Sequence, residues 1–95
     1  AVPEEYALHF NYPNPFNPVT TMLYDLPEAG YTRLIIYDLL GRQVQTLVDQ
    51  PLDAGYYRMQ WDGRNSQGQM VGAGVYLYQI QASEYISTKK MVLLK

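Results

Sequence analysis

Apolar and polar residues alternate with a period of two along most of this chain, and this pattern constrains its fold more than any other feature. The alternation is clear in residues 20–26, 32–38 and 56–61, where every second side chain from Tyr57 to Trp61 is large and apolar. A β-strand points successive side chains to opposite faces, whereas an amphipathic helix repeats about every 3.6 residues. The pattern therefore predicts strands throughout and requires no helix.

Turn residues divide the chain into about seven predicted strands, roughly 8–12 residues apart. The predicted strands cover residues 7–12, 20–26, 32–38, 43–48, 56–61, 75–82 and 85–94. This count and spacing predict an all-β fold, an immunoglobulin-like antiparallel β-sandwich of about seven strands. Residues 75–82 are apolar on both faces and are expected in mid-sheet, and Trp61 is expected at the centre of the core.

Three details of the connections follow from individual residues. Leu39 to Arg42 is predicted to be a hairpin turn in which Gly41 supplies a positive φ. Residues 43–48 alternate less regularly, which predicts a bulge or an irregular edge strand. Asp49 to Gly55 contains Pro51 and is predicted to be a loop.

Composition excludes several classes of function. The 95 residues fit one domain, and the net charge of −2 offers no basic surface for nucleic acid. No apolar run is long enough to span a membrane, and the lack of cysteine excludes disulfides and thiolate metal sites. The acidic first five residues do not resemble a signal peptide, so any export signal is expected upstream.

The sequence offers no set of catalytic residues. His9 is the only histidine, and the three serines, Ser66, Ser83 and Ser87, fall in predicted turns or strand edges. No glycine-rich phosphate loop precedes a helix, and no carboxylate pair is placed in a cleft. We therefore predict that the chain is not an enzyme and holds no cofactor.

The polar loop that begins at Asp62 contains oxygen ligands at short spacing, which raises the possibility of calcium. Its acidic residues are too few for an EF-type loop, which also needs a bidentate glutamate at its end. We expect Asp62 to cap its own turn instead, and we predict no metal site.

Residues 11–18 form a stiff segment, because three of these eight residues are prolines and each restricts the residue before it. Tyr12 and Phe16 are expected to pin the segment onto the sandwich, and Asn14 and Asn17 to form Asx turns. One interpretation is a rigid lead-in that seals an end of the core. The other is a recognition surface, since a preformed extended segment loses little entropy on binding.

Two further motifs allow a structural and a functional interpretation. Gly74-Val75-Tyr76 follows a glycine-rich loop, so Tyr76 is a candidate tyrosine corner whose hydroxyl binds the backbone. Lys89 and Lys90 in the last strand are typical of edges protected against aggregation. Together with Lys95, they are also candidates for a docking signal near the chain end.

A series of short motifs follows in order along the chain: Asn11-Tyr12-Pro13-Asn14-Pro15-Phe16-Asn17-Pro18, Thr20-Thr21, Leu26-Pro27, Ile36-Tyr37-Asp38-Leu39-Leu40-Gly41-Arg42, Ala54-Gly55, Trp61-Asp62-Gly63, Gly68, Gly74-Val75-Tyr76 and Lys89-Lys90-Met91-Val92-Leu93-Leu94. This order resembles the type A C-terminal sorting domains of the type IX (Por) secretion system, from about Tyr12 to the last residue. It also resembles the related Ig-like domain of the flagellar hook-capping protein.

The resemblance implies a non-catalytic signal that directs a larger protein through the type IX secretion system, for surface attachment or release. The implied partners are an outer-membrane translocon, a sortase-like peptidase and an N-terminal cargo domain in the same polypeptide. The implied route leads through the periplasm to the cell surface or the medium. Residues 1–11 would be the end of an interdomain linker with a possible first strand, and residues 12–95 the sorting domain.

The implied translocon-recognition residues are distant in sequence, and they are Pro13, Asn14, Pro15, Gly74, Tyr76, Lys89, Lys90 and Lys95. Only a folded sandwich could bring them together, so we predict that they converge on one end or edge.

Two alternatives remain open. Tyr31, Tyr56 and Tyr85 could form a sugar-stacking platform of an accessory carbohydrate-binding module. A role in structural assembly, as in hook capping, is the other.

Overall fold

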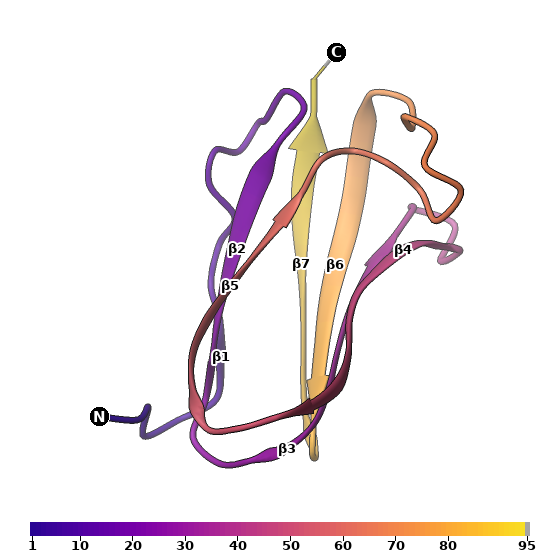
Figure 1. Ribbon diagram of the computed structural model, residues 1–95. Coiled ribbons are helices and arrows are strands. Elements are labelled where there is room, and N and C mark those ends of the chain that lie inside the picture. The colour runs from indigo at the N-terminus through magenta and orange to yellow at the C-terminus, as the bar shows by residue number, and fades with distance from the viewer. Residues whose placement is uncertain (95) are drawn as a thin grey trace.

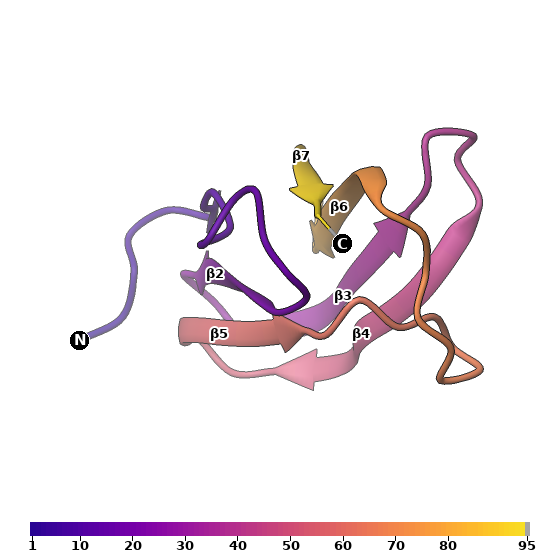
Figure 2. The same ribbon diagram turned by 90° about the horizontal axis from the view of Figure 1, so that it is seen from above.

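The computed structural model describes residues 1–94, which form two antiparallel sheets packed face to face (Figures 1 and 2). The strands are β1 (Ala7–Leu8), β2 (Thr20–Leu26), β3 (Gly30–Tyr37), β4 (Gln43–Leu52), β5 (Gly55–Trp61), β6 (Gly74–Ala82) and β7 (Tyr85–Leu93). The three-stranded sheet has the order β1-β2-β5, and the four-stranded sheet has the order β4-β3-β6-β7. The prediction of an Ig-like sandwich of about seven strands is confirmed.

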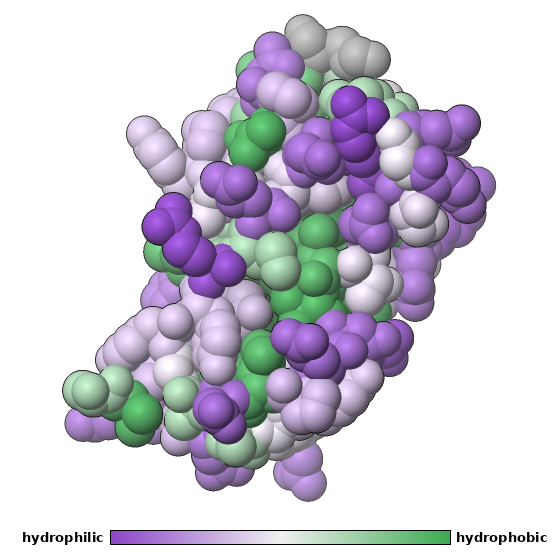
Figure 3. Space-filling view, viewed as in Figure 1, coloured by the Kyte–Doolittle hydropathy of each residue, from purple (hydrophilic) through white to green (hydrophobic). Residues whose placement is uncertain are grey.

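The alternating residues face the space between the two sheets, as predicted. In β2, Met22, Tyr24 and Leu26 are buried, whereas Leu23 points outward and is exposed. β5 alternates in the same way and ends at the buried Trp61. On the face shown in Figure 3, hydrophobic side chains gather in the middle and hydrophilic ones surround them.

Trp61 lies at the centre of an aromatic cluster in the core. Its ring centroid is 5.8 Å from that of Phe16 and 5.5 Å from that of Tyr76, with tilted or edge-on geometry. Such geometry directs the positive ring edge of one aromatic side chain at the negative face of another. The indole N–H donates to the carbonyl oxygen of Arg64 at 2.9 Å, so its polar atom is also paired.

The expected loop at Asp49 to Gly55 is largely wrong, because β4 continues to Leu52 and Pro51 pairs with Tyr31 of β3. β4 is an edge strand of its sheet, and a proline can sit there because one side of the backbone has no ladder partner. The predicted irregularity is confirmed: the β3–β4 register shifts twice, between Leu34 and Ile35 and between Ile36 and Tyr37.

Other predicted connections hold, with changes at the ends of strands. Gly41 has a φ of 85°, as the hairpin turn required. The first predicted strand shrinks to Ala7–Leu8, and the prolines that follow leave only isolated pairings. Within residues 1–94, no helix is long and apolar enough to cross a lipid bilayer.

Replacing Trp61 by alanine should lower the free energy of unfolding by about 3–5 kcal/mol, because it removes the ring that Phe16 and Tyr76 pack against. Urea denaturation followed by far-UV circular dichroism measures the loss. Tyr56→Ala on the same strand is the control, since Tyr56 is exposed and should change stability by less than about 0.5 kcal/mol. Equal losses in the two variants would show that the core is not centred on Trp61.

Candidate functional site

The strap, which we define as residues 13–18, lies beside the end of β7 and bonds to it as an added strand would (Figure 1). The Phe16 N–H donates to the Val92 carbonyl oxygen at 2.9 Å, and the Leu94 N–H donates to the Phe16 carbonyl oxygen at 2.8 Å. The Val92 N–H donates to Oδ1 of Asn14 at 3.0 Å. The strap therefore occupies the edge of the four-stranded sheet at this end.

The start of β6 lies at the same end of the sandwich. Gly74 pairs with Leu93 of β7, and Tyr76 pairs with Met91. Gly74 has a φ of 148°, a conformation that other residues rarely adopt, so the chain requires glycine where it enters β6. The fold thus brings the Pro13–Pro15 and Gly74–Tyr76 motifs to the end of β7, as predicted for them.

Tyr76 makes the backbone contact that was predicted for it. Its hydroxyl donates to the carbonyl oxygen of Gly72 at 2.6 Å, and its ring packs edge-on against Trp61. Burial raises the pKa of the Tyr76 phenol, so the hydroxyl remains a donor at neutral pH. Tyr76 therefore fixes the last residues of the glycine-rich loop to the core.

The lysines take different positions. Lys89 and Lys90 lie in the middle of β7, paired with Tyr78 and Leu77 rather than with the start of β6. Lys90 is exposed, whereas Lys89 is half-buried with its Nζ 4.1 Å from the ring centroid of Phe10, close enough for a cation–π contact. Lys89 and Lys90 therefore lie on β7 but away from its end, where the strap and the start of β6 meet it. Lys95 lies outside the described residues.

A buried polar network that was not predicted from the sequence holds the chain before the strap. The Tyr78 hydroxyl donates to the His9 carbonyl oxygen at 2.8 Å and accepts from the Asn11 N–H at 2.9 Å. The side-chain NH₂ group of Asn11 donates to Oγ1 of Thr20 at 3.0 Å. The Thr20 hydroxyl in turn donates to the Pro13 carbonyl oxygen at 2.8 Å. In the sequence, the one indication of this network was the pair of polar residues on either side of the strap, Asn11 and Thr20.

Two expectations for the strap were wrong. Asn14 does not form an Asx turn, because the strap lies beside β7 and its side chain reaches the Val92 N–H instead. Tyr12 is 80% exposed, whereas Phe16 is 1% exposed, so only Phe16 pins the strap to the core. Tyr12 points outward because it pairs with Thr21, an outward-facing position of the three-stranded sheet.

The oxygen atoms of the Asp62 loop bind the backbone of the loop itself. Oδ1 of Asp62 accepts from the Arg64 N–H at 3.2 Å, as expected. Oδ1 of Asn65 accepts from the N–H groups of Gln67 and Gln69 at 3.0 Å each. Throughout residues 1–94, no three histidine or acidic side chains lie close enough together to hold a metal ion.

The three tyrosines considered for a sugar platform do not share a face. Tyr31 points outward from β3 of the four-stranded sheet, and Tyr56 points outward from β5 of the other sheet. Tyr85 is half-buried and stacks on Tyr6, with ring centroids 5.2 Å apart. These three rings therefore cannot bind one sugar chain together.

Asn14→Ala should lower the free energy of unfolding by about 1 kcal/mol, because the Val92 N–H loses its acceptor. Hydrogen exchange followed by NMR should show faster exchange at the Val92 amide. Asn17→Ala is the matched control, since the exposed Asn17 side chain has no hydrogen bond to another residue within 1–94. Unchanged exchange at Val92 would contradict the role of Asn14.

Tyr78→Phe should cost about 1–3 kcal/mol of unfolding free energy at pH 7, because the Asn11 N–H and the His9 carbonyl lose their partner. Urea denaturation measures the cost, and Tyr12→Phe, which alters an exposed ring, should change little. Equal stability of Tyr78→Phe and the parent would contradict the network.

The same hydroxyl gives a dependence on pH. Burial raises the pKa of Tyr78 to about 12 in the folded state, above the ordinary value of 10.0. Its contribution is therefore complete below pH 10 and lost as the pH rises from 10 through 12. Between pH 10 and 12, the Tyr78→Phe variant should therefore lose less stability than the parent protein. It should still lose some, because burial also raises the pKa of Tyr24 to about 12.

Comparison with known structures finds the same sandwich in two much larger proteins of Porphyromonas gingivalis. Dimeric latent PorU matches with a TM-score of 0.68 and 21% identity, over 95% of this chain and 9% of PorU. PorZ, an essential surface component of the type IX secretion system, matches with a TM-score of 0.61 and 19% identity, over 95% of this chain and 11% of PorZ. The chain spans about a tenth of each protein, and these similarities establish the fold.

In sequence, no curated protein matches the chain. The family model of the FlgD Ig-like domain matches residues 18–85, from the end of the strap to the start of β7. That range is more than half of the 95 residues. The chain therefore belongs to the FlgD Ig-like domain family.

Proposed function

We propose that this chain is a non-catalytic C-terminal sorting domain that directs a larger protein through the type IX secretion system. The observation that carries the proposal is the contact between the strap and β7, which joins the Pro13–Pro15 motif to the last described strand. The match to segments of PorU and PorZ supports it, because PorZ is a component of that system.

The proposed recognition surface is the end of the sandwich formed by the strap and the paired ends of β6 and β7. Asn14 and Phe16 hold the last residues of β7 in one position, so a partner meets an ordered surface and loses little entropy on binding. Lys89, Lys90 and Lys95 are proposed as a second, charged part of the signal along β7 and after it. The proposed partners are the outer-membrane translocon and a sortase-like peptidase.

In this proposal a cargo domain precedes the chain, and a linker joins the two. Pro3 and Leu8 are buried and Tyr6 stacks on Tyr85, so the packed body includes residues from Pro3 onward. We place the end of the linker before Pro3, and processing by the peptidase would require the exposed chain upstream. The exported product would pass through the periplasm to the cell surface or the medium.

A role in structural assembly is the second candidate, and the match to the FlgD Ig-like domain favours it. Such a module would act as part of a permanent assembly and would not direct an unrelated protein outward. Export of a foreign cargo therefore distinguishes the two candidates.

The test is to fuse a signal peptide and a folded fluorescent reporter upstream of Ala1 in a bacterium that has the type IX system. The reporter should reach the cell surface or the medium, and it should remain in the periplasm in a strain without the translocon. Retention of a correctly folded fusion in the periplasm of the intact strain would refute the sorting role.

Variants of the fusion test the surface itself. Asn14→Ala and the double change Lys89→Gln with Lys90→Gln should each reduce export several-fold. Tyr31→Ala, which alters an exposed side chain of β3 outside the proposed surface, should not. Circular dichroism of the purified chains separates loss of recognition from loss of folding. Full export by both altered fusions would refute this assignment of the signal.

A further inference from the structure

The outer face of the three-stranded sheet carries large apolar side chains that the core does not use. Phe10 is 75% exposed, Tyr56 66% and Leu23 45%, and the exposed Tyr12 lies near Leu23. Isolated exposed apolar residues are common on proteins, but a group on one sheet face marks a candidate binding surface. The alternation of β2 and β5 explains the position of Leu23 and Tyr56, which lie opposite the buried residues.

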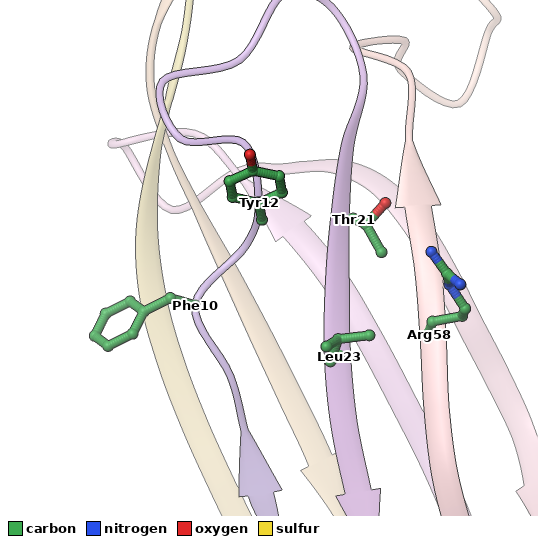
Figure 4. Close-up of a pocket in the computed structure, with 5 residues that line it drawn as sticks. All are labelled: Phe10, Tyr12, Thr21, Leu23 and Arg58. Carbon is green, nitrogen blue, oxygen red and sulfur yellow. The ribbon is translucent and has the colours of Figure 1, made fainter.

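Two hollows lie side by side on this face and share Leu23. The first has a volume of about 180 Å³ and is lined by Phe10, Tyr12, Thr21, Leu23 and Arg58 (Figure 4). The second has a volume of about 300 Å³ and is lined by His9, Leu23, Asp25, Tyr56 and Tyr57. We call the two together the β2–β5 groove. Figure 4 shows Tyr12 and Phe10 on the segment before the strap, and Arg58 on the far side of β2.

The charges in the groove are unequal. No carboxylate lines the first hollow, and among the described residues no ion pair includes Arg58. Lys89 lies outside this lining, against the ring of Phe10. The one carboxylate of the second hollow, Asp25, is bound to His9 at 2.9 Å. The first hollow is therefore cationic, although the chain as a whole has a net charge of −2.

Most backbone groups of β2, the strand along the floor of the groove, already have partners in this chain. β2 pairs with β5 on one side. On its other side, the Leu23 carbonyl accepts from the His9 N–H, and Tyr12 and Thr21 exchange two backbone hydrogen bonds at 2.9 Å. A peptide that binds by adding a strand needs main-chain hydrogen bonds at a sheet edge, whereas the exposed side chains of this groove lie on a sheet face.

A sugar chain fits these features better. One face of a sugar ring is covered by C–H groups, which pack against the negative face of an aromatic ring, while the sugar hydroxyls stay hydrated at the rim. A guanidinium binds a carboxylate or phosphate through two parallel hydrogen bonds. We propose that the β2–β5 groove binds an acidic polysaccharide, with a sugar ring against Tyr12 and Leu23 and its anionic group on Arg58.

The test is native affinity electrophoresis of the 95-residue chain in gels containing one polymer at a time. Polygalacturonate supplies carboxylates, phosphorylated amylopectin supplies phosphates, and dextran is the neutral control. At least one acidic polymer should retard the chain, and dextran should not. The net negative charge of the chain opposes non-specific attraction to either acidic polymer.

Variants on the two faces of the sandwich locate the site. Arg58→Gln should weaken binding by about tenfold, since it removes a charge-assisted hydrogen-bonding group, and Tyr12→Ala should weaken it several-fold. Arg33→Gln and Tyr31→Ala make the same chemical changes on the outer face of the four-stranded sheet, and they should bind like the parent.

Three outcomes of the electrophoresis would overturn the proposal. These are no retardation by either acidic polymer, equal retardation by dextran, and equal losses in the variants of the two faces. Analytical ultracentrifugation gives a further check. If the chain dimerises and Tyr12→Ala makes it monomeric, the groove is an interface between copies and the proposal fails. The binding assay needs no secretion system, so its result is independent of the sorting role.

Discussion

The position of Phe16 is the constraint on which much of this structure depends. Its side chain is buried against Trp61 of the three-stranded sheet, while its N–H and carbonyl bond to β7 of the four-stranded sheet. One residue therefore joins the two sheets at the end where the candidate recognition surface lies. Because the prolines on either side restrict the backbone, little conformational entropy is lost when the strap takes this position.

The strap also solves a general problem of β-sandwiches, which is the exposure of backbone groups at sheet edges. At the end of β7, Phe16 and Asn14 occupy those groups. Further along β7, the half-buried Lys89 discourages pairing with another chain, because that chain would have to accommodate its charge. On the opposite edge, Pro51 and the shifts in register have the same effect in β4. These features hinder the pairing of another chain with β7 or β4, and so they hinder aggregation through the sheet edges.

Local alternation was enough to predict the class of fold, the faces of β2 and β5, and the central place of Trp61. It was not enough at Pro51, because a proline ends an interior strand but not an edge strand, and sequence does not reveal which strand is an edge. Ile35 is buried although it points away from the core, since it lies between Thr46 and Gln79 on neighbouring strands.

The candidate site shows the same limit. The tyrosine corner at Tyr76 could be predicted because its partner, Gly72, is four residues away. The partner of Asn14 is Val92, and that of Tyr78 is the backbone around His9, so both contacts depend on how the whole chain folds. Sequence motifs could name the residues that meet at the end of β7, but not the hydrogen bonds by which they meet.

The rule of alternation extends beyond the strands into the segment before the strap, and this links the two surfaces. Asn11 points inward to Tyr78 and Thr20, whereas its exposed neighbours Phe10 and Tyr12 are among the residues that line the β2–β5 groove. The inward residue fixes the backbone, and the fixed backbone holds the outward rings in place. Exposed aromatic side chains usually lose conformational entropy when a ligand binds them. The loss is smaller when buried hydrogen bonds already fix the backbone that carries the rings. The buried network thus orders both the strap that reaches β7 and the wall of the groove, and Lys89 of the proposed signal contacts Phe10 in that wall.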